Sequence, residues 1–228
     1  MINVATVHYN TPELTTAWAR SIKKWMPDAR ITVFDNSDRR PFPEMEGVTV
    51  IDNTEQQVVD FDSLLEKYPQ RDTTRSQCGS VRHTMSVDML WEYISEGFIL
   101  FDSDTLLERD ISDWCDPEVA WVGQVQAGMI LGGHPFRQRL LPFCCWINVP
   151  MCKAAGIRYF DEKRTWKLVP SMLYDTGASF YNDCRRCALK VREEDLRHVI
   201  VHFRSGSWDA KDPTDWLREN IRCYKGVD

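Results

Sequence analysis

The chain has 228 residues and a mass of 26.6 kDa, which suits one domain or one domain with a small appendage. Its 43% apolar and 27% charged residues are ordinary for a soluble globular protein and exclude a disordered tail. The 28 basic and 34 acidic side chains leave a net charge of −6, which argues against a nucleic-acid binder, because such proteins carry a basic patch or stripe.

The amino terminus and the cysteines indicate the compartment in which the chain folds. The terminus has neither a basic start nor a cleavage-like site, and no window holds the ~18 apolar residues of a membrane span. We therefore expect a cytoplasmic protein without an integral membrane segment. The eight cysteines include the C-x-x-C pair Cys184 and Cys187, for which zinc would need two more ligands from Cys144, Cys145 and Cys152. Buried structural thiols are the favoured interpretation.

The first half of the chain alternates predicted strands with predicted helices. The strands are short apolar runs bounded by turn residues, and the helices begin at capping residues and end at Pro27 and Gly97. In chain order we predict a strand at 4–7, a helix from 12 to 26, strands at 31–34 and 48–51, a surface loop at 53–79 with at most one helical turn near Leu64, a helix from 80 to 96, and a strand at 98–101.

The second half is less regular and predicts a mixed edge with helices laid against the first half. The predicted elements are strands at 119–126, 143–149 and 198–203 and helices at 176–190 and 213–224. This order implies an α/β fold with a mainly parallel sheet covered on both faces, in one domain spanning residues 1–228. In such sheets ligands bind beyond the carboxyl ends of the strands.

Polar side chains follow three of the predicted strands and meet at one rim of the sheet. They are Tyr9 and Asn10, Asp35 and Asn36, and Asp102 and Asp104. The D-x-D motif also occurs at Asp60 and Asp62, where a solvated loop is the simpler explanation. At Asp102 and Asp104 a buried strand fixes both carboxylates and leaves them solvated, so this pair is the candidate for binding a metal or a nucleotide.

Three segments resemble the nucleotide-binding half of GT-A glycosyltransferases, particularly the family 2-like group. Residues 7–14 are similar to that family's first strand and turn, residues 33–38 to its second strand, and residues 101–105 to its D-x-D metal motif. The resemblance implies a Rossmann-like GT-A fold, with residues 1–110 as the nucleotide-sugar-binding half and residues 111–228 as the acceptor-binding half.

The resemblance also implies a site for a divalent cation. Asp102 would meet the donor's ribose or the metal, and Asp104 would be the direct ligand to Mn²⁺ or Mg²⁺. His202, before a Ser-Gly-Ser turn, is similar to the histidine that completes this site in several GT-A enzymes, and His198 is the competing candidate. The ion would neutralise the charge that grows on the donor's diphosphate as the sugar–phosphate bond breaks.

The same resemblance assigns residues to the nucleotide of the donor. Asn10 and Asp35 would hold the base, and Tyr9 would line its pocket. The stretch 80–88 resembles a donor-side helix start, which places Arg82 and His83 at a helix N-terminus, where phosphate binds readily. An ordinary helix cap with surface charges is the alternative.

Asp175 resembles the general base on the acceptor side of inverting family members. Such a base takes the proton of the acceptor hydroxyl as that hydroxyl attacks the anomeric carbon. From the residues alone, Asp175 is equally well explained as the cap of the following helix, and the two roles can coexist. Trp146, Trp166 and Trp208 are candidates for stacking on a sugar, although tryptophans more often fill a core.

The resemblance implies a metal-dependent glycosyltransferase that moves a sugar from a UDP or GDP sugar to a hydroxyl of a glycan or lipid-linked acceptor. The expected reaction proceeds with inversion, and the expected setting is the assembly of glycans or polysaccharides. Two alternatives remain open: a sugar-phosphate nucleotidyltransferase and a catalytically silent nucleotide-sugar-binding module. The first strand lacks the Gly-rich phosphate loop of a nucleotidyltransferase, and a polar turn replaces it.

Overall fold

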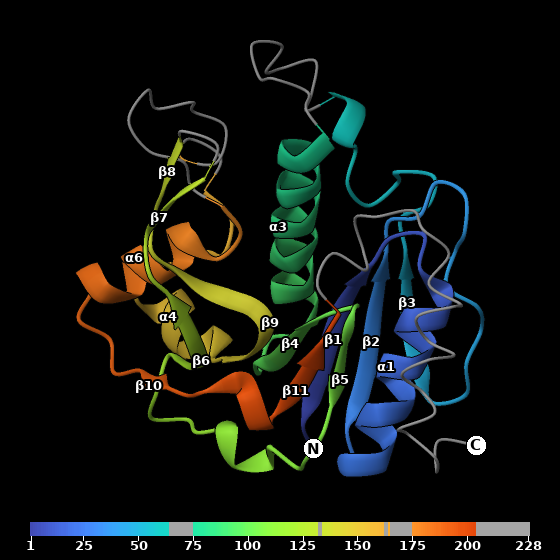
Figure 1. Ribbon diagram of the computed structural model, residues 1–228, viewed down its shortest axis with the longest axis horizontal. Coiled ribbons are helices and arrows are strands. Elements are labelled where there is room, and N and C mark those ends of the chain that lie inside the picture. The colour runs from blue at the N-terminus through green and yellow to red at the C-terminus, as the bar shows by residue number, and fades with distance from the viewer. Residues whose placement is uncertain (64–74, 132–133, 162–163, 165–174, 204–228) are drawn as a thin grey trace.

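The computed structural model describes residues 1–63, 75–131, 134–161, 164 and 175–203 (Figure 1). Strands and helices alternate in the first half, and short strands and helices mix in the second. The elements are β1 (Asn3–His8), α1 (Pro12–Trp25), β2 (Arg30–Asp35), β3 (Val48–Asp52), α3 (Arg75–Tyr93), β4 (Phe98–Asp102), β5 (Thr105–Leu107), η1 (Ser112–Trp114), β6 (Trp121–Gln126), β7 (Met129–Leu131), β8 (His134–Phe136), β9 (Arg139–Ile147), α4 (Val149–Ala154), α6 (Ala178–Arg186), β10 (Arg192–Glu193), η2 (Leu196–His198) and β11 (Ile200–His202).

Seven strands form the central sheet in the order β10-β6-β9-β4-β1-β2-β3. Its pairings are parallel except for those of β9, which runs antiparallel to both β4 and β6. Two small sheets accompany it, one of β5 and β11 and one of β7 and β8. The predicted fold class, a mainly parallel α/β sheet with a mixed second half, is confirmed.

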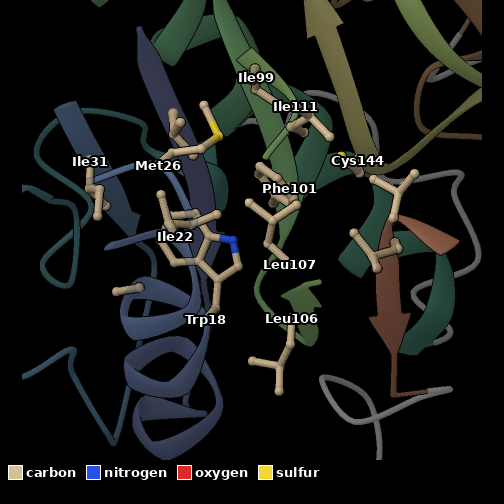
Figure 2. Close-up of a cluster of buried hydrophobic side chains, with 14 of the residues drawn as sticks. Trp18, Ile22, Met26, Ile31, Ile99, Phe101, Leu106, Leu107, Ile111 and Cys144 are labelled. Carbon is tan, nitrogen blue, oxygen red and sulfur yellow. The ribbon is translucent and has the colours of Figure 1, made fainter. Parts of the chain in front are cut away.

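The helices α1 and α3 cover opposite faces of this sheet. Alternate residues of β1 and β4 enter two separate hydrophobic clusters, so each strand contributes side chains to both faces. Trp18 and Ile22 of α1 belong to the cluster shown in Figure 2, and Leu90 and Trp91 of α3 belong to the other. Because both faces are covered, β4 begins with four apolar residues that are all fully buried.

The sheet changes its direction of growth between β1 and β4. The connection through α1 leads from β1 to β2 on one side, and the connection through α3 leads from β3 to β4 on the other side. In open α/β sheets, the crevice outside the carboxyl ends of the strands at such a point is where ligands bind. Tyr9 and Asn10 follow β1 at this point, and Asp102 ends β4.

Some element boundaries differ from those predicted. The helix α3 begins at Arg75, so the predicted loop at 53–79 is wrong from residue 75 onward. The strand β9 begins at Arg139 and not at residue 143, because a shift in its register against β6 accommodates Pro142. None of the described helices combines the length and the apolar character needed to cross a bilayer. The predicted helical turn near Leu64 is confirmed as far as residue 63, since residues 61–63 are helical, and Leu64 itself and the predicted helix at 213–224 lie outside the described residues.

Candidate active site

The end of β4 presents two carboxylates. Asp102 is the last residue of β4, and Asp104 lies in the short turn before β5. The Thr6 hydroxyl donates a hydrogen bond to the Phe101 carbonyl (2.9 Å), and the Thr105 hydroxyl donates one to the Asp102 carbonyl (2.7 Å). The backbone is therefore fixed on both sides of the pair. The prediction that both carboxylates are solvated is wrong for Asp104, which is 2% exposed, because β5 and β11 fold back beside it.

Strand pairing brings His202 to this turn. In the antiparallel pair of β5 and β11, His202 stands opposite Thr105, the residue after Asp104. The Phe203 backbone N–H donates to the Asp104 carbonyl (2.9 Å), which continues the pairing by one residue. His202 Nε2 then lies 3.4 Å from Asp104 Oδ1. The pairing of β5 with β11, two three-residue strands far apart in the sequence, thus brings His202 beside Asp104.

Asp102, Asp104 and His202 fit a divalent cation. One ligand atom from each lies within 4.8 Å of the others, and this is the single such group of His, Cys, Asp or Glu among the described residues. Two carboxylates at this spacing repel each other unless a cation lies beside them. Carboxylate oxygens suit Mn²⁺ and Mg²⁺ alike, and the imidazole suits Mn²⁺ better.

The helix α3 places His83 next to this group, and Arg82 precedes His83 in the same helix. His83 Nε2 lies 3.2 Å from Asp102 Oδ1, and the Arg82 guanidinium lies 5.2 Å from the centre of the Phe61 ring. The prediction that Arg82 and His83 lie at a helix N-terminus is wrong, because α3 begins at Arg75, about two turns earlier. Contact with phosphate therefore remains a prediction that rests on their side chains alone.

Asp175 precedes α6 and is held by two hydrogen bonds. Arg139 Nη1 donates to its Oδ2, and the Thr176 backbone N–H donates to its Oδ1 (2.8 Å). Arg139 is fixed in turn by Gln126, whose Oε1 accepts from Nε at 2.6 Å. The alternative that Asp175 caps the helix is wrong, because the N-cap of α6 is Gly177 and no side chain accepts a hydrogen bond there.

Neighbouring residues of α3 connect the Asp175 turn to the carboxylates of β4. His83 faces Asp102, and the next residue, Thr84, donates a hydrogen bond to the hydroxyl of Thr176 (3.3 Å). Thr176 directly follows Asp175. The helix α3 therefore contacts Asp102 through His83 and the residue after Asp175 through Thr84.

Tyr9 and Asn10 hold Asp38, an acidic residue that the sequence analysis did not single out. The Tyr9 hydroxyl donates to Asp38 Oδ2 (3.2 Å), and Asn10 Nδ2 donates to Oδ1 (2.6 Å). Slight burial raises the pKa of Asp38, but hydrogen bonds from Asn10, Tyr9 and Arg39 outweigh it and lower the pKa below its ordinary value. The available signal was its place in the polar run after β2, beside the residues that follow β1.

Asp35, the predicted contact for the base, is turned into the protein. It is 2% exposed, and its carboxylate accepts hydrogen bonds from the backbone N–H groups of Ser37 (2.9 Å) and Phe42 (2.7 Å). These bonds shape the loop after β2. Contact between Asp35 and a nucleotide base therefore stays a prediction.

The cysteine pair joins no metal cluster in the part of the chain that the structure describes. Cys184 is buried, as are Cys144, Cys145 and Cys152, which confirms the interpretation of structural thiols for these four. Burial raises the pKa of the Cys144 thiol and that of the Cys145 thiol well above the ordinary pKa of a cysteine. The same interpretation is wrong for Cys187, which is exposed.

The structure also bears on the remaining candidate residues, which are three tryptophans and His198. Trp146 is 8% exposed and belongs to the hydrophobic core, so it is not free to stack on a sugar. His198 lies in η2 and is not part of the metal-ligating group, which favours His202 over it. Trp166 and Trp208 lie outside the described residues.

Comparisons with known proteins bear on the fold. No family model matches the chain, and no curated protein matches it. The galactosyltransferase LgtC, solved with donor and acceptor sugar analogs, superposes with a TM-score of 0.53 at 16% identity, over 86% of this chain and 74% of that one. An active-site mutant of LgtC has a TM-score of 0.50 at 14% identity, with the same coverage. This chain has a GT-A-like fold.

A third solved structure, the glycosyltransferase GlyE of Streptococcus pneumoniae TIGR4, has a TM-score of 0.49 at 11% identity, over 86% of this chain and 45% of that one. The GT-A resemblance of residues 7–14, 33–38 and 101–105 agrees with the likeness in fold to LgtC, which extends over 86% of this chain. Membership of the family 2-like group remains a prediction.

Proposed function

We propose that the chain is a metal-dependent glycosyltransferase that moves a sugar from a nucleotide-diphosphate sugar of the UDP or GDP type to an acceptor hydroxyl. The observation that carries this proposal is the convergence of Asp102, Asp104 and His202 at the carboxyl end of β4. The position of this group, where the sheet changes its direction of growth, supports a ligand site there. The GT-A-like fold agrees with this assignment.

Asp102, Asp104 and His202 are the residues that would hold Mn²⁺ or Mg²⁺. When bound, such an ion neutralises the charge that develops on the leaving diphosphate. Arg82 and His83 of α3 are proposed to bind the phosphates, His83 from its place beside Asp102. Tyr9 and Asn10 are proposed to hold the nucleoside from the end of β1, and Asp35 is proposed to contribute to this site by holding the loop after β2.

Asp175 is proposed as the general base of an inverting reaction. Its bonds to Arg139 and to the Thr176 backbone fix its orientation, and lone pairs remain on each oxygen to accept from a substrate hydroxyl. NMR of the first product formed from an α-linked donor tests this role. A β-linked product supports it, and an α-linked product overturns the base assignment while leaving sugar transfer in place.

The acceptor is proposed to be a glycan or a lipid-linked sugar, bound by the half of the chain after residue 110, in the assembly of glycans or polysaccharides. Proteins with the same type of fold include LgtC, whose structure contains donor and acceptor sugar analogs. Cytoplasmic localisation is part of the same proposal. Scanning defined oligosaccharides with the cognate donor tests the acceptor class directly.

Calorimetric titration of UDP and GDP, with and without Mn²⁺, tests the proposal as a whole. We expect one of them to bind in an Mn²⁺-dependent manner and the corresponding nucleotide sugar to be hydrolysed slowly. Asp104→Ala should weaken the Mn²⁺-dependent binding at least about tenfold. Asp28→Ala, an exposed site in the turn before β2 at the opposite end of the strands, should leave it unchanged.

Each alternative function gives a different result in this experiment. Release of pyrophosphate from a nucleoside triphosphate and a sugar phosphate indicates nucleotidyl transfer. Binding of a nucleotide sugar without any turnover indicates a silent binding module. If the nucleotide affinity is the same with and without Mn²⁺ and is unchanged by Asp104→Ala, the metal-dependent mechanism is wrong.

A further inference from the structure

The imidazole of His202 stacks on the ring of Phe143. The two ring centres are 3.8 Å apart, and the planes differ by 19°. Phe143 comes from β9 of the central sheet, whereas His202 comes from β11 of the small sheet, so the contact joins the two sheets. Phe143 is only partly buried and packs at the margin of the hydrophobic cluster that α1 covers.

Strand pairing alone does not determine the orientation of the His202 ring. The register of β5 and β11 fixes its backbone, but the second side-chain torsion of histidine is broad. The side chain is 23% exposed, so the protein does not enclose it completely. A flat aromatic surface at 3.8 Å restricts the imidazole to one plane, and in that plane Nε2 lies 3.4 Å from Asp104 Oδ1.

We infer that Phe143 is a positioning residue for His202, which holds the imidazole plane in the orientation that a divalent cation requires. The inference rests on the proposed function, because it takes His202 as a metal ligand. Replacing a residue that orients a metal ligand typically weakens metal binding by about ten- to a hundredfold. Phe143 would do so by ring stacking and not by a hydrogen bond.

Titration of the full chain with Mn²⁺ alone, with the free ion followed by electron paramagnetic resonance, tests this inference. We expect Phe143→Leu to weaken Mn²⁺ binding by about tenfold, because leucine fills much of the space without offering a flat surface. Phe143→Tyr, which keeps the ring, should restore the affinity to within about twofold. Urea unfolding without metal reports separately on any loss of folding.

A matched control is Phe42→Leu. Phe42 is a phenylalanine that also contacts a histidine, the buried His8, with the ring centres 5.7 Å apart and edge-on. This substitution should change stability and leave Mn²⁺ affinity as it is in the unsubstituted chain. If Phe143→Leu weakens Mn²⁺ binding no more than Phe42→Leu does, the inference is wrong.

A double substitution tests whether Phe143 acts through His202. In a His202→Ala background, Phe143→Leu should cause no further loss of Mn²⁺ affinity, and a further loss of several fold would contradict the positioning role. Failure of the unsubstituted chain to bind Mn²⁺ overturns the metal site and this inference together. Normal binding that is insensitive to Phe143→Leu overturns this inference alone.

Discussion

At the scale of single residues, Asp35 and Asp38 show how two acids in one polar run acquire different roles. Asp35 faces inward and closes the loop by accepting from the N–H groups of Ser37 and Phe42. Asp38 is exposed and is held from outside by Asn10 and Tyr9. The first acid therefore supports the shape of the loop after β2, and the second presents a charge beside the end of β1.

Replacement of Asp35 by Asn should lower the free energy of unfolding by about 1–3 kcal/mol. The amide presents an N–H group where one of the two buried backbone N–H donors needs an acceptor, and hydrogen bonds to charged groups are worth about 1.5–3 kcal/mol. The control Asp38→Asn should change stability by less than about 0.5 kcal/mol, because the site is exposed. Urea denaturation measures both. Equal stability of the two variants would show that the Asp35 carboxylate does not hold the loop.

At the scale of elements, the turn before α6 is held in place by the start of β9. Gly177 adopts a left-handed conformation with a φ of +79°, and a Cβ atom there would collide with the carbonyl oxygen of Leu140. Arg139, the residue before Leu140, binds Asp175. The strand therefore positions the candidate base through a close backbone approach and an ion pair together.

Gly177→Ala should destabilise the protein by at least about 2 kcal/mol, because the left-handed conformation costs about 1–2 kcal/mol and the backbone collision adds to it. Gly156→Ala is the control, since Gly156 has a φ of +69° but no atom within 4 Å of an added Cβ. The control should lose only about 1 kcal/mol. Urea denaturation of both variants gives the comparison, and equal losses would mean that Leu140 moves aside at little cost.

What the sequence predicts well at this scale is local. The strands of the first half are apolar runs followed by polar residues, so their existence and the convergence of their ends follow from short-range pattern. What it misses depends on distant partners. The ion pair of Arg139 and Asp175 joins residues 36 apart, and the inward turn of Asp35 depends on an N–H group seven residues later.

The same distinction explains the candidate metal site. Asp102 and Asp104 stand out because a buried strand precedes them, which is a property of neighbouring residues. His202 is found through the family resemblance alone, because its place beside Asp104 depends on the pairing of β11 with β5, almost a hundred residues away (Ile200 opposite Leu107). Short strands of this kind carry too few residues for a periodic pattern to reveal them.

At the scale of the whole molecule, a fully buried histidine makes stability depend on pH. His8 Nε2 donates to the Arg40 carbonyl (3.1 Å), and Nδ1 lies 2.7 Å from the Thr15 hydroxyl, so the ring joins β1, α1 and the loop after β2. Burial lowers its pKa below the ordinary 6.5. Asp35, Glu13 and the bond to the Arg40 carbonyl oppose this, and the charge of Arg40 adds to it.

The free energy of unfolding should therefore fall as the pH drops from about 7 to about 5. Below its ordinary pKa of 6.5, His8 takes up a proton in the unfolded chain, whereas in the folded protein it resists protonation down to a lower pH. The unfolded state then binds more protons, so acid favours it. The contribution of this one group is at most about 1.4 kcal/mol for each pH unit.

Urea denaturation at several pH values gives the slope of the free energy of unfolding against pH. The substitution His8→Gln, which retains a donor and an acceptor, should flatten this slope between about pH 7 and about pH 5. The control His198→Gln removes an exposed histidine in η2 and should leave the slope as it is. An unchanged slope in His8→Gln would assign the acid sensitivity to other groups and remove His8 as its cause.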